Sequence, residues 1–209
     1  PMVANRGGEA TPAGIWLDAD AAPIAGYSKE GRPQVAAGGK GTQGGKGKLA
    51  YRPGWHLGSI PYALQFNRGK KVDNPLGILT KKGTPVQVGE YFPKNFVWAE
   101  VEYAADVDYQ KEANSYGQLK NGKFRHSYAG LPYLPANGAY TYRTNPNPAT
   151  DPWIITGAMK VNRILTPTEV DELVKAAGRE PQKRQEGAVT DQQVQELNEA
   201  IADRTRSDE

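Results

Sequence analysis

Glycine and proline interrupt this sequence at short intervals, and their spacing limits the regular structure that the chain can form. The 209 residues include 24 glycines and 16 prolines. Glycine widens the freedom of the backbone and proline removes an amide donor, so both residues tend to end helices and strands. We therefore expect short strands joined by long loops, among them a mobile glycine-rich loop over 31–48 and a second loop over 67–93.

Strand patterns occur between and beyond these loops. Alternating apolar and polar side chains, or runs of β-branched residues, are typical of strands. Such patterns occur at 15–19, 96–103, 124–128, 139–144 and 153–165. Gly157 lies inside the last run, where a glycine indicates a bulge or the close approach of another backbone segment.

Helix signals dominate the C-terminal part of the sequence. Residues 166–169 (Thr-Pro-Thr-Glu) and 190–193 (Thr-Asp-Gln-Gln) both match the capping box, in which the first and fourth residues satisfy each other's backbone amides. We expect the first helix to end at Gly178 and the second to carry a thin apolar stripe as far as Ala202. A shorter helix is expected over 108–117, with Asp108 as its cap.

These patterns together predict an α+β fold, with a twisted, mainly antiparallel sheet, long Gly/Pro-rich loops and C-terminal helices. We place the folded domain at 15–178. Residues 1–14 are small and polar, so we expect a disordered tail there. Residues 179–209 are expected to form a linker and a C-terminal amphipathic helix, which packs weakly or binds a partner because its apolar stripe is narrow.

Composition excludes several classes of site. The chain has no cysteine, which rules out disulfides, thiolate metal ligands and a cysteine nucleophile. Its two histidines, His56 and His126, are too few for an ordinary zinc site, so we expect no metal. No apolar run reaches the roughly 18 residues of a membrane span, and the N-terminal segment lacks the apolar core of a signal peptide.

Charge is unevenly distributed, although the net charge is only +3. Nine basic residues and one acidic residue lie between Lys29 and Lys71, whereas the segment 164–209 is acidic. A basic segment is usually a solvated loop, but it can also attract the phosphate groups of nucleotides or nucleic acids. A nucleic acid is therefore one candidate partner.

The segment 49–66 concentrates aromatic and polar side chains around a Pro-Gly turn. His56 has Tyr51, Arg52, Trp55 and Tyr62 close to it in sequence. Aromatic rings can stack on a flat ligand and an arginine can hold a phosphate group, so this cluster is a candidate ligand site. The alternative is that His56 caps the turn while the aromatic side chains form core.

Acidic residues cluster in and after the strand predicted at 96–103. Glu100 and Glu102 share one strand face, and Asp106 and Asp108 follow directly. Carboxylates near a ribose can bind its hydroxyl groups or stabilise a cationic sugar during glycosyl transfer. The alternative is a solvated strand face followed by turn-forming aspartates.

Two histidines and a lysine would allow a different chemistry, that of a metal-independent ribonuclease. One of His56 and His126 would take the 2′-hydroxyl proton and the other would protonate the leaving oxygen. Lys160 would stabilise the charged phosphate. The sequence does not show whether the two histidines share one site.

Four segments resemble a domain of the large polyvalent proteins that bacteriophages and related mobile elements encode. They are YRPGWHLGSIP, VWAEVEYAADVDYQKEAN, YTYRTNPNP and WIITGAMKVNRIL, and the resemblance covers about residues 15–178. It implies an effector that counters host functions, located in the host cytoplasm or in the virion. A host protein joins nucleic acid among the candidate partners.

A more distant resemblance is to the ADP-ribosyltransferase fold, in particular to small rifampin-modifying transferases. His56-Leu57-Gly58 is similar to the family's His-Gly-Thr motif, and residues 101–106 are similar to its strand with an acidic turn. Tyr142-Arg143-Thr144 and the strand at 154–161 are similar to its last two strands.

This second resemblance implies a domain that binds NAD and transfers or hydrolyses ADP-ribose. His56 would hold the ribose, and Glu102, Asp106 or Asp108 would stabilise the cationic sugar. The residues implied to line the cofactor site are Tyr51, Arg52, Trp55, Tyr62, Tyr142 and Arg143. A non-catalytic module that binds a host protein or a virion component is the remaining alternative.

Overall fold

The computed structural model describes residues 12–19, 24–27, 33–36, 48–50, 54–80, 82–117, 131, 133–142 and 153–207. Within these ranges the fold is α+β, as expected, with strands that pair mainly antiparallel and with helices at the C-terminal end. The strand predicted at 124–128 and most of the tail predicted at 1–14 lie outside the described residues.

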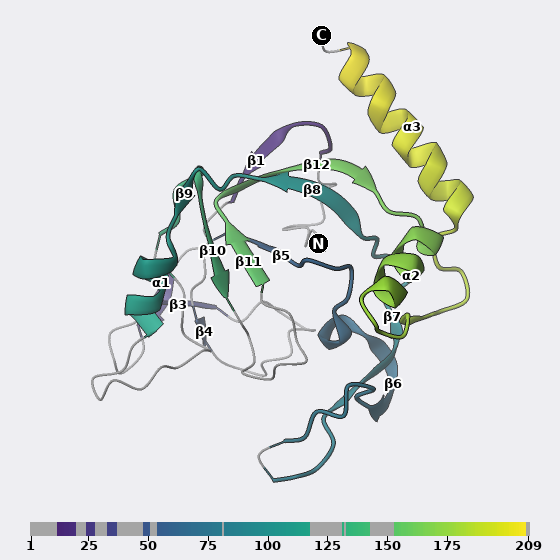
Figure 1. Ribbon diagram of the computed structural model, residues 1–209, viewed down its shortest axis with the longest axis horizontal. Coiled ribbons are helices and arrows are strands. Elements are labelled where there is room, and N and C mark those ends of the chain that lie inside the picture. The colour runs from purple at the N-terminus through teal and green to yellow at the C-terminus, as the bar shows by residue number, and fades with distance from the viewer. Residues whose placement is uncertain are drawn as a thin grey trace.

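Two sheets stacked over one apolar core form the centre of the fold (Figure 1). The strands of the first sheet are, in spatial order, β1 (Trp16–Asp18), β12 (Ala158–Ile164) and β8 (Ala99–Tyr103), and its pairs are antiparallel. The strands of the second sheet are, in spatial order, β5 (Trp55–Leu57), β11 (Trp153–Thr156), β10 (Gly138–Tyr142) and β9 (Val107–Asp108). In this sheet β9 and β10 are parallel and the other pairs are antiparallel.

Strands β11 and β12 are one run of chain that bends at Gly157 and therefore belongs to both sheets. A Cβ atom at this position would lie 1.9 Å from the carbonyl oxygen of Pro135, so the close approach requires glycine. The Gly157 N–H donates to the Gly138 carbonyl at 2.9 Å. Next to it, the fully buried Thr156 hydroxyl donates to the Ala104 carbonyl at 2.7 Å. The close backbone approach expected from the sequence is confirmed.

The core between the two sheets takes side chains from both of them. Leu57 of the second sheet packs there with Ala99, Met159 and Val161 of the first, and each is at most 5% exposed. Ile154 of β11 packs against this group. Because neighbouring side chains of a strand point to opposite faces, the residues between these core positions point outward. This alternation decides which candidate site residues can share a surface.

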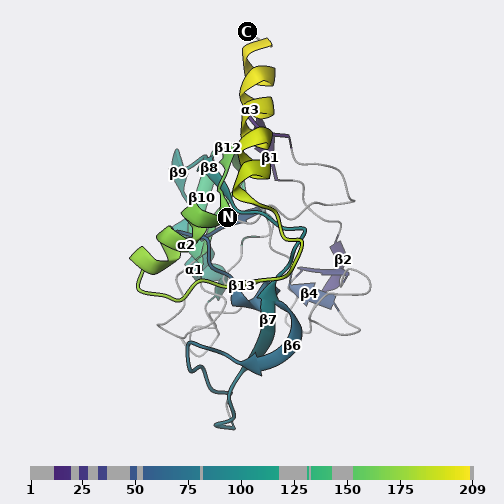
Figure 2. The same ribbon diagram turned by 90° about the vertical axis from the view of Figure 1, so that its right-hand side faces the viewer.

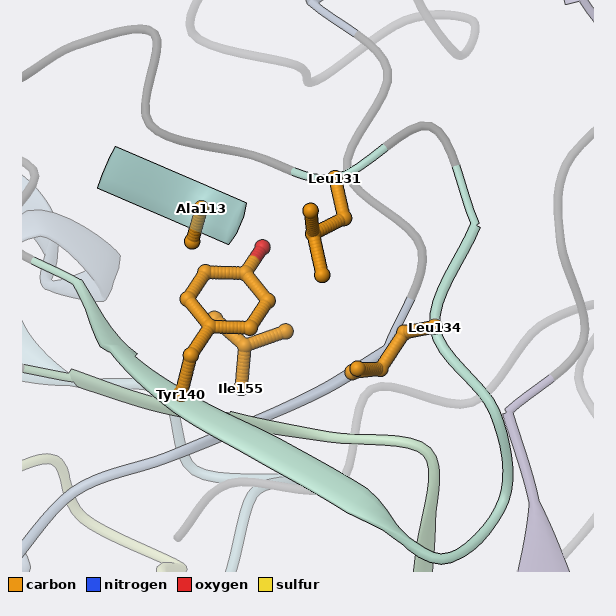
Figure 3. Packing of buried hydrophobic residues seen from close by; sticks show 5 residues of the cluster. All are labelled: Ala113, Leu131, Leu134, Tyr140 and Ile155. Atoms are coloured by element: carbon orange, nitrogen blue, oxygen red, sulfur yellow. The ribbon is translucent and has the colours of Figure 1, made fainter. Parts of the chain in front are cut away.

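The outer face of the second sheet carries a separate core, beside helix α1 (Gln110–Gly117). Tyr140 of β10 and Ile155 of β11 point from the sheet into this core (Figure 3). The other buried members of the cluster are Ala113, Leu131 and Leu134. The short helix expected over 108–117 is confirmed.

Strands β6 (Arg68–Asp73) and β7 (Gln87–Phe92) form an antiparallel hairpin, which follows a 3-10 helix at Leu64–Phe66. Strand β13 (Lys183–Arg184) pairs with β7 in parallel. The prediction of a loop over 67–93 is therefore wrong. Its physical reason is that five of the six β6 residues are exposed, so the segment lacks the alternation that marks a half-buried strand.

A further sheet contains β2 (Ile24–Tyr27), β3 (Pro33–Ala36) and β4 (Lys48–Ala50), paired antiparallel. Strand β3 and Lys48, the first residue of β4, fall inside the segment 31–48 that was expected to be a loop, which corrects that prediction for these five residues. The glycines of the segment lie outside Pro33–Ala36, so the backbone there can pair as a strand.

Both predicted capping boxes are present at the helices α2 (Pro167–Ala176) and α3 (Asp191–Ser207). At α2, the Thr166 hydroxyl accepts the Glu169 N–H and the Glu169 carboxylate accepts the Thr166 N–H. Thr190 and Gln193 form the same reciprocal pair at α3. Helix α2 is followed by Gly178 with a φ of +72°. Helix α3 continues past Ala202, where the predicted apolar stripe ends.

The first half of α3 and the segment before it are held against the rest of the molecule. Val194 is fully buried, and the Asn198 side chain makes two hydrogen bonds of 2.8 Å to the backbone of Ile164. Before the helix, Arg184 binds the Asp171 carboxylate at 2.6 Å. The second half of α3 extends outward, at the end of the molecule opposite the β6–β7 hairpin (Figures 1 and 2).

Candidate functional site

His56 lies in the middle of β5 and points away from the core between the sheets. Its strand neighbours Trp55 and Leu57 both pack into that core, so strand alternation turns the imidazole to the outer face of the second sheet. His56 Nδ1 lies 3.2 Å from the Gly54 carbonyl oxygen. Because a carbonyl oxygen only accepts, Nδ1 is the donor in this contact.

A cross-strand row of side chains continues from His56 over this face. His56 pairs with Ile155, which in turn pairs with Tyr140. Directly paired residues of antiparallel strands point to the same side of a sheet, so the three side chains share the outer face. Tyr109 and Trp153 pack against the same cluster. The surroundings of His56 on this face are therefore apolar and aromatic.

Two aromatic residues predicted to line a cofactor site have other contacts. The Trp55 indole N–H donates to the Leu17 carbonyl oxygen at 2.9 Å, and its ring packs in the core between the sheets. The Arg179 guanidinium lies 5.2 Å from the centre of the Tyr62 ring. Burial raises the pKa of the Tyr62 hydroxyl, while the nearby Arg179 lowers it to a lesser extent. Trp55 thus points to the face opposite His56, and Tyr62 is partly covered by an arginine.

Glu102 forms an ion pair with Lys160 on the outer face of the first sheet. The two residues pair across β8 and β12, with 2.7 Å between the Lys160 Nζ and a Glu102 carboxylate oxygen. The hydrogen bond from Lys160 lowers the pKa of Glu102, as do the charge of Lys160 and the Asn162 amide. Lys160 also lies 5.6 Å from the centre of the half-exposed Trp16 ring.

The structure does not bring His56 together with Glu102 or Lys160. His56 is on the outer face of the second sheet and the ion pair is on the outer face of the first, with the buried core between them. Stacked sheets lie about 10 Å apart, so groups on their two outer faces are farther apart than this. A proton transfer needs direct hydrogen-bond contact or a single bridging water.

The two candidate aspartates lie near the far edge of the second sheet. The Asp108 carboxylate accepts the Gln110 N–H at 2.8 Å at the start of α1, so the predicted capping role is confirmed. Asp106 is exposed in the bend between β8 and β9. Strands β9 and β5 are three strand spacings apart, which is about 14 Å at 4.8 Å per spacing.

The remaining predicted site residues are only partly placed. Tyr51, Arg52, His126 and Arg143 lie outside the described residues, and Tyr142 is placed by its backbone pairing with Trp153. The part of the chain that the structure describes contains no group of three or more His, Cys, Asp or Glu residues that could hold a metal ion. Within the same residues, no helix has the length and apolar character needed to cross a membrane.

A cleft of about 510 Å³ between α3 and the outer face of the first sheet was not predicted from the sequence. Its lining residues include Asn162 and Ile201, together with the three cations Lys160, Arg163 and Arg206. Each of these cations is already paired with a carboxylate. A single sequence gives no signal for this cleft, because it depends on which sheet face α3 crosses. The paired charges leave it without an excess of positive charge for an anion.

Comparisons with protein-family models, curated proteins and solved structures gave no match to this chain.

Proposed function

We propose that this chain is an ADP-ribosyltransferase-like domain that binds NAD on the outer face of the second sheet, as an effector acting on a host target. The placement of His56 supports this most. The residue lies just after Gly54, points away from the inter-sheet core and donates from Nδ1 to the Gly54 carbonyl oxygen. An imidazole on this face is a polar group of the kind that can hydrogen-bond a ribose hydroxyl group.

The character of the surrounding face fits the rest of such a ligand. The half-buried rings of Tyr109 and Trp153 pack against the cluster that shares the face with His56, whereas Tyr140 is buried within that cluster. Aromatic side chains bind flat heterocycles such as nicotinamide by offset stacking or edge contacts. A largely apolar surface with a small number of placed polar groups is typical of small-molecule sites.

The proposal assigns ribose binding to His56 and assigns no role to Glu102 or Asp108. Glu102 is paired with Lys160 on the other outer face, and the Asp108 carboxylate caps α1. His56 does not share a site with Lys160, so the three-residue ribonuclease that the sequence allows is not the function we propose. Because His56 lies apart from Glu102 and Lys160, the proposal concerns NAD binding at His56.

The test is calorimetric titration of the full chain with NAD, followed by a chromatographic assay for released nicotinamide. We expect NAD to bind and His56→Ala to weaken binding about fivefold, since a neutral hydrogen bond contributes about 1 kcal/mol. Glu102→Gln is the matched control, because it removes a titratable group on the opposite outer face. Its dissociation constant for NAD should equal that of the wild type.

Three outcomes would contradict the proposal. Absence of a heat signal at millimolar NAD would remove NAD as the ligand. Unchanged binding by His56→Ala would remove His56 from the site. Weaker binding by Glu102→Gln, with His56→Ala unaffected, would move the site to the outer face of the first sheet.

A further inference from the structure

The hairpin of β6 and β7 extends away from the two stacked sheets in both views (Figures 1 and 2). We call residues 67–93 the arm. Its outer part is ordered by hydrogen bonds between its own backbone groups: Asn74 N–H donates to the Val86 carbonyl at 2.8 Å, and Thr80 N–H donates to the Thr84 carbonyl at 2.7 Å. At its base, a Cβ atom on Gly89 would lie 2.4 Å from the backbone opposite, so the two strands are closely packed there. Beyond its base, where β13 pairs with Tyr91 and Phe92 of β7, the arm is therefore a preformed two-stranded ribbon.

The arm carries the whole net charge of the chain. It contains five basic residues and two acidic ones, a net charge of +3. The chain contains 26 basic and 23 acidic residues, so 21 of each remain outside the arm and cancel. The basic residues are Arg68, Lys70, Lys71, Lys81 and Lys82, and the acidic ones are Asp73 and Glu90.

The described cations of the arm differ from those that line the α3 cleft. Arg68, Lys70, Lys71 and Lys82 are exposed, and none of them forms an ion pair within the described part of the chain. By contrast, the cations that line the α3 cleft are all paired with carboxylates. Of the two acids in the arm, Glu90 is paired with Lys183 of β13. The positive charge of the arm is therefore available to an external anion.

We propose that the arm binds the phosphate backbone of a nucleic-acid duplex. A two-stranded β-ribbon fits the major groove of DNA, which is about 12 Å wide. Single strands are usually bound by stacking their bases on exposed aromatic rings. The only aromatic residues of the arm are Tyr91 and Phe92, which are half-buried and buried. Charge and shape therefore favour a duplex over a single strand, and contacts to phosphates make the binding independent of base sequence. This inference does not depend on NAD binding.

The experiment measures fluorescence anisotropy of a labelled duplex of about 20 base pairs, with DNA and RNA duplexes run in parallel, between roughly 50 and 200 mM salt. Each phosphate contact adds about −0.9 to the slope of log affinity against log salt concentration. The variant Arg68→Gln/Lys70→Gln/Lys71→Gln removes three exposed cations. We expect it to bind at least about tenfold more weakly and to reduce the magnitude of the slope by about 2.7.

The matched control has the same net charge but changes exposed cations on the three helices, as Lys111→Gln/Lys175→Gln/Arg206→Gln. It should bind the duplex within about twofold of the wild type, since nearby contacts and not net charge dominate at these salt concentrations. Circular dichroism and thermal melting would show that both variants fold, because all six side chains are exposed.

Four results would overturn the inference. The wild type does not bind either duplex at the lowest salt concentration, or both triple variants weaken binding equally. Alternatively, the wild type binds a single strand more tightly than either duplex, or polyglutamate at an equal charge concentration displaces the duplex. The last result would indicate an acidic protein surface as the ligand.

Discussion

Asn198 connects α3 to the first sheet, and replacing it with alanine should release the outer half of the helix. Its side chain accepts the Ile164 N–H and donates to the Ile164 carbonyl oxygen, both at 2.8 Å. Two hydrogen bonds at about 1 kcal/mol each are lost in Asn198→Ala. Alanine returns about 0.5 kcal/mol through its higher helix propensity. The net loss is about 1.5 kcal/mol, or roughly a tenfold larger opening equilibrium constant for this part of the helix.

Hydrogen–deuterium exchange of the α3 amides measures this opening directly. We expect exchange to quicken about tenfold after residue 198, while the amides near the fully buried Val194 change less. Glu199→Ala is the control, because it also places alanine in the exposed part of α3 but removes no contact to the sheet. Equal exchange in Asn198→Ala and the wild type would show that the two hydrogen bonds do not hold the helix, and the reasoning would fail.

Two further predictions concern the bend at Gly157 and the capping box formed by Thr166 and Glu169. Gly157→Ala should destabilise the protein by about 3 kcal/mol or more in urea unfolding, because its Cβ atom would overlap the Pro135 carbonyl oxygen; an unchanged midpoint would refute this. The pKa of Glu169 lies below its ordinary value of 4.5 because the Thr166 backbone N–H and the Arg163 side chain stabilise its carboxylate. The stability that Glu169 contributes is therefore present above its unfolded pKa and is lost as the pH falls through the lowered folded pKa. The Tm advantage of the wild type over Glu169→Gln should shrink as the pH falls below the ordinary pKa of 4.5, and a constant difference would contradict this.

The parts of the fold that the sequence predicted are those set by local chemistry. The capping boxes at Thr166 and Thr190 define helix starts through pairs of residues three positions apart. Gly157 marks a position where the neighbouring backbone leaves no space for a side chain. The β6–β7 hairpin was missed because its two strands pair across the connecting segment 74–86, and a pattern within one strand does not reveal this pairing. Its first strand is exposed on both faces, so no alternation reveals it.

The arrangement of the candidate site residues was harder to predict from local sequence patterns than the secondary structure was. Strand alternation correctly placed Glu102 on an exposed strand face, and Asp108 was correctly expected to cap a helix. Which outer face each residue occupies depends on the bend at Gly157, where one strand passes from one sheet to the other. A pattern of period two within a strand carries no information about such a bend. The separation of His56 from Lys160 was therefore not predictable from the sequence.

The shared strand β11–β12 also sets an order of assembly. It is the last strand of both sheets along the chain, and it lies in the interior of each, between β5 and β10 and between β1 and β8. Trp16 pairs with Lys160, 144 residues later in the chain, and His56 pairs with Ile155, 99 residues later. Pairing over such long separations slows folding, because the loop entropy is lost before the contacts form. During synthesis, neither sheet can close until residues 153–164 have left the ribosome, so the two sheets should form together in one late step.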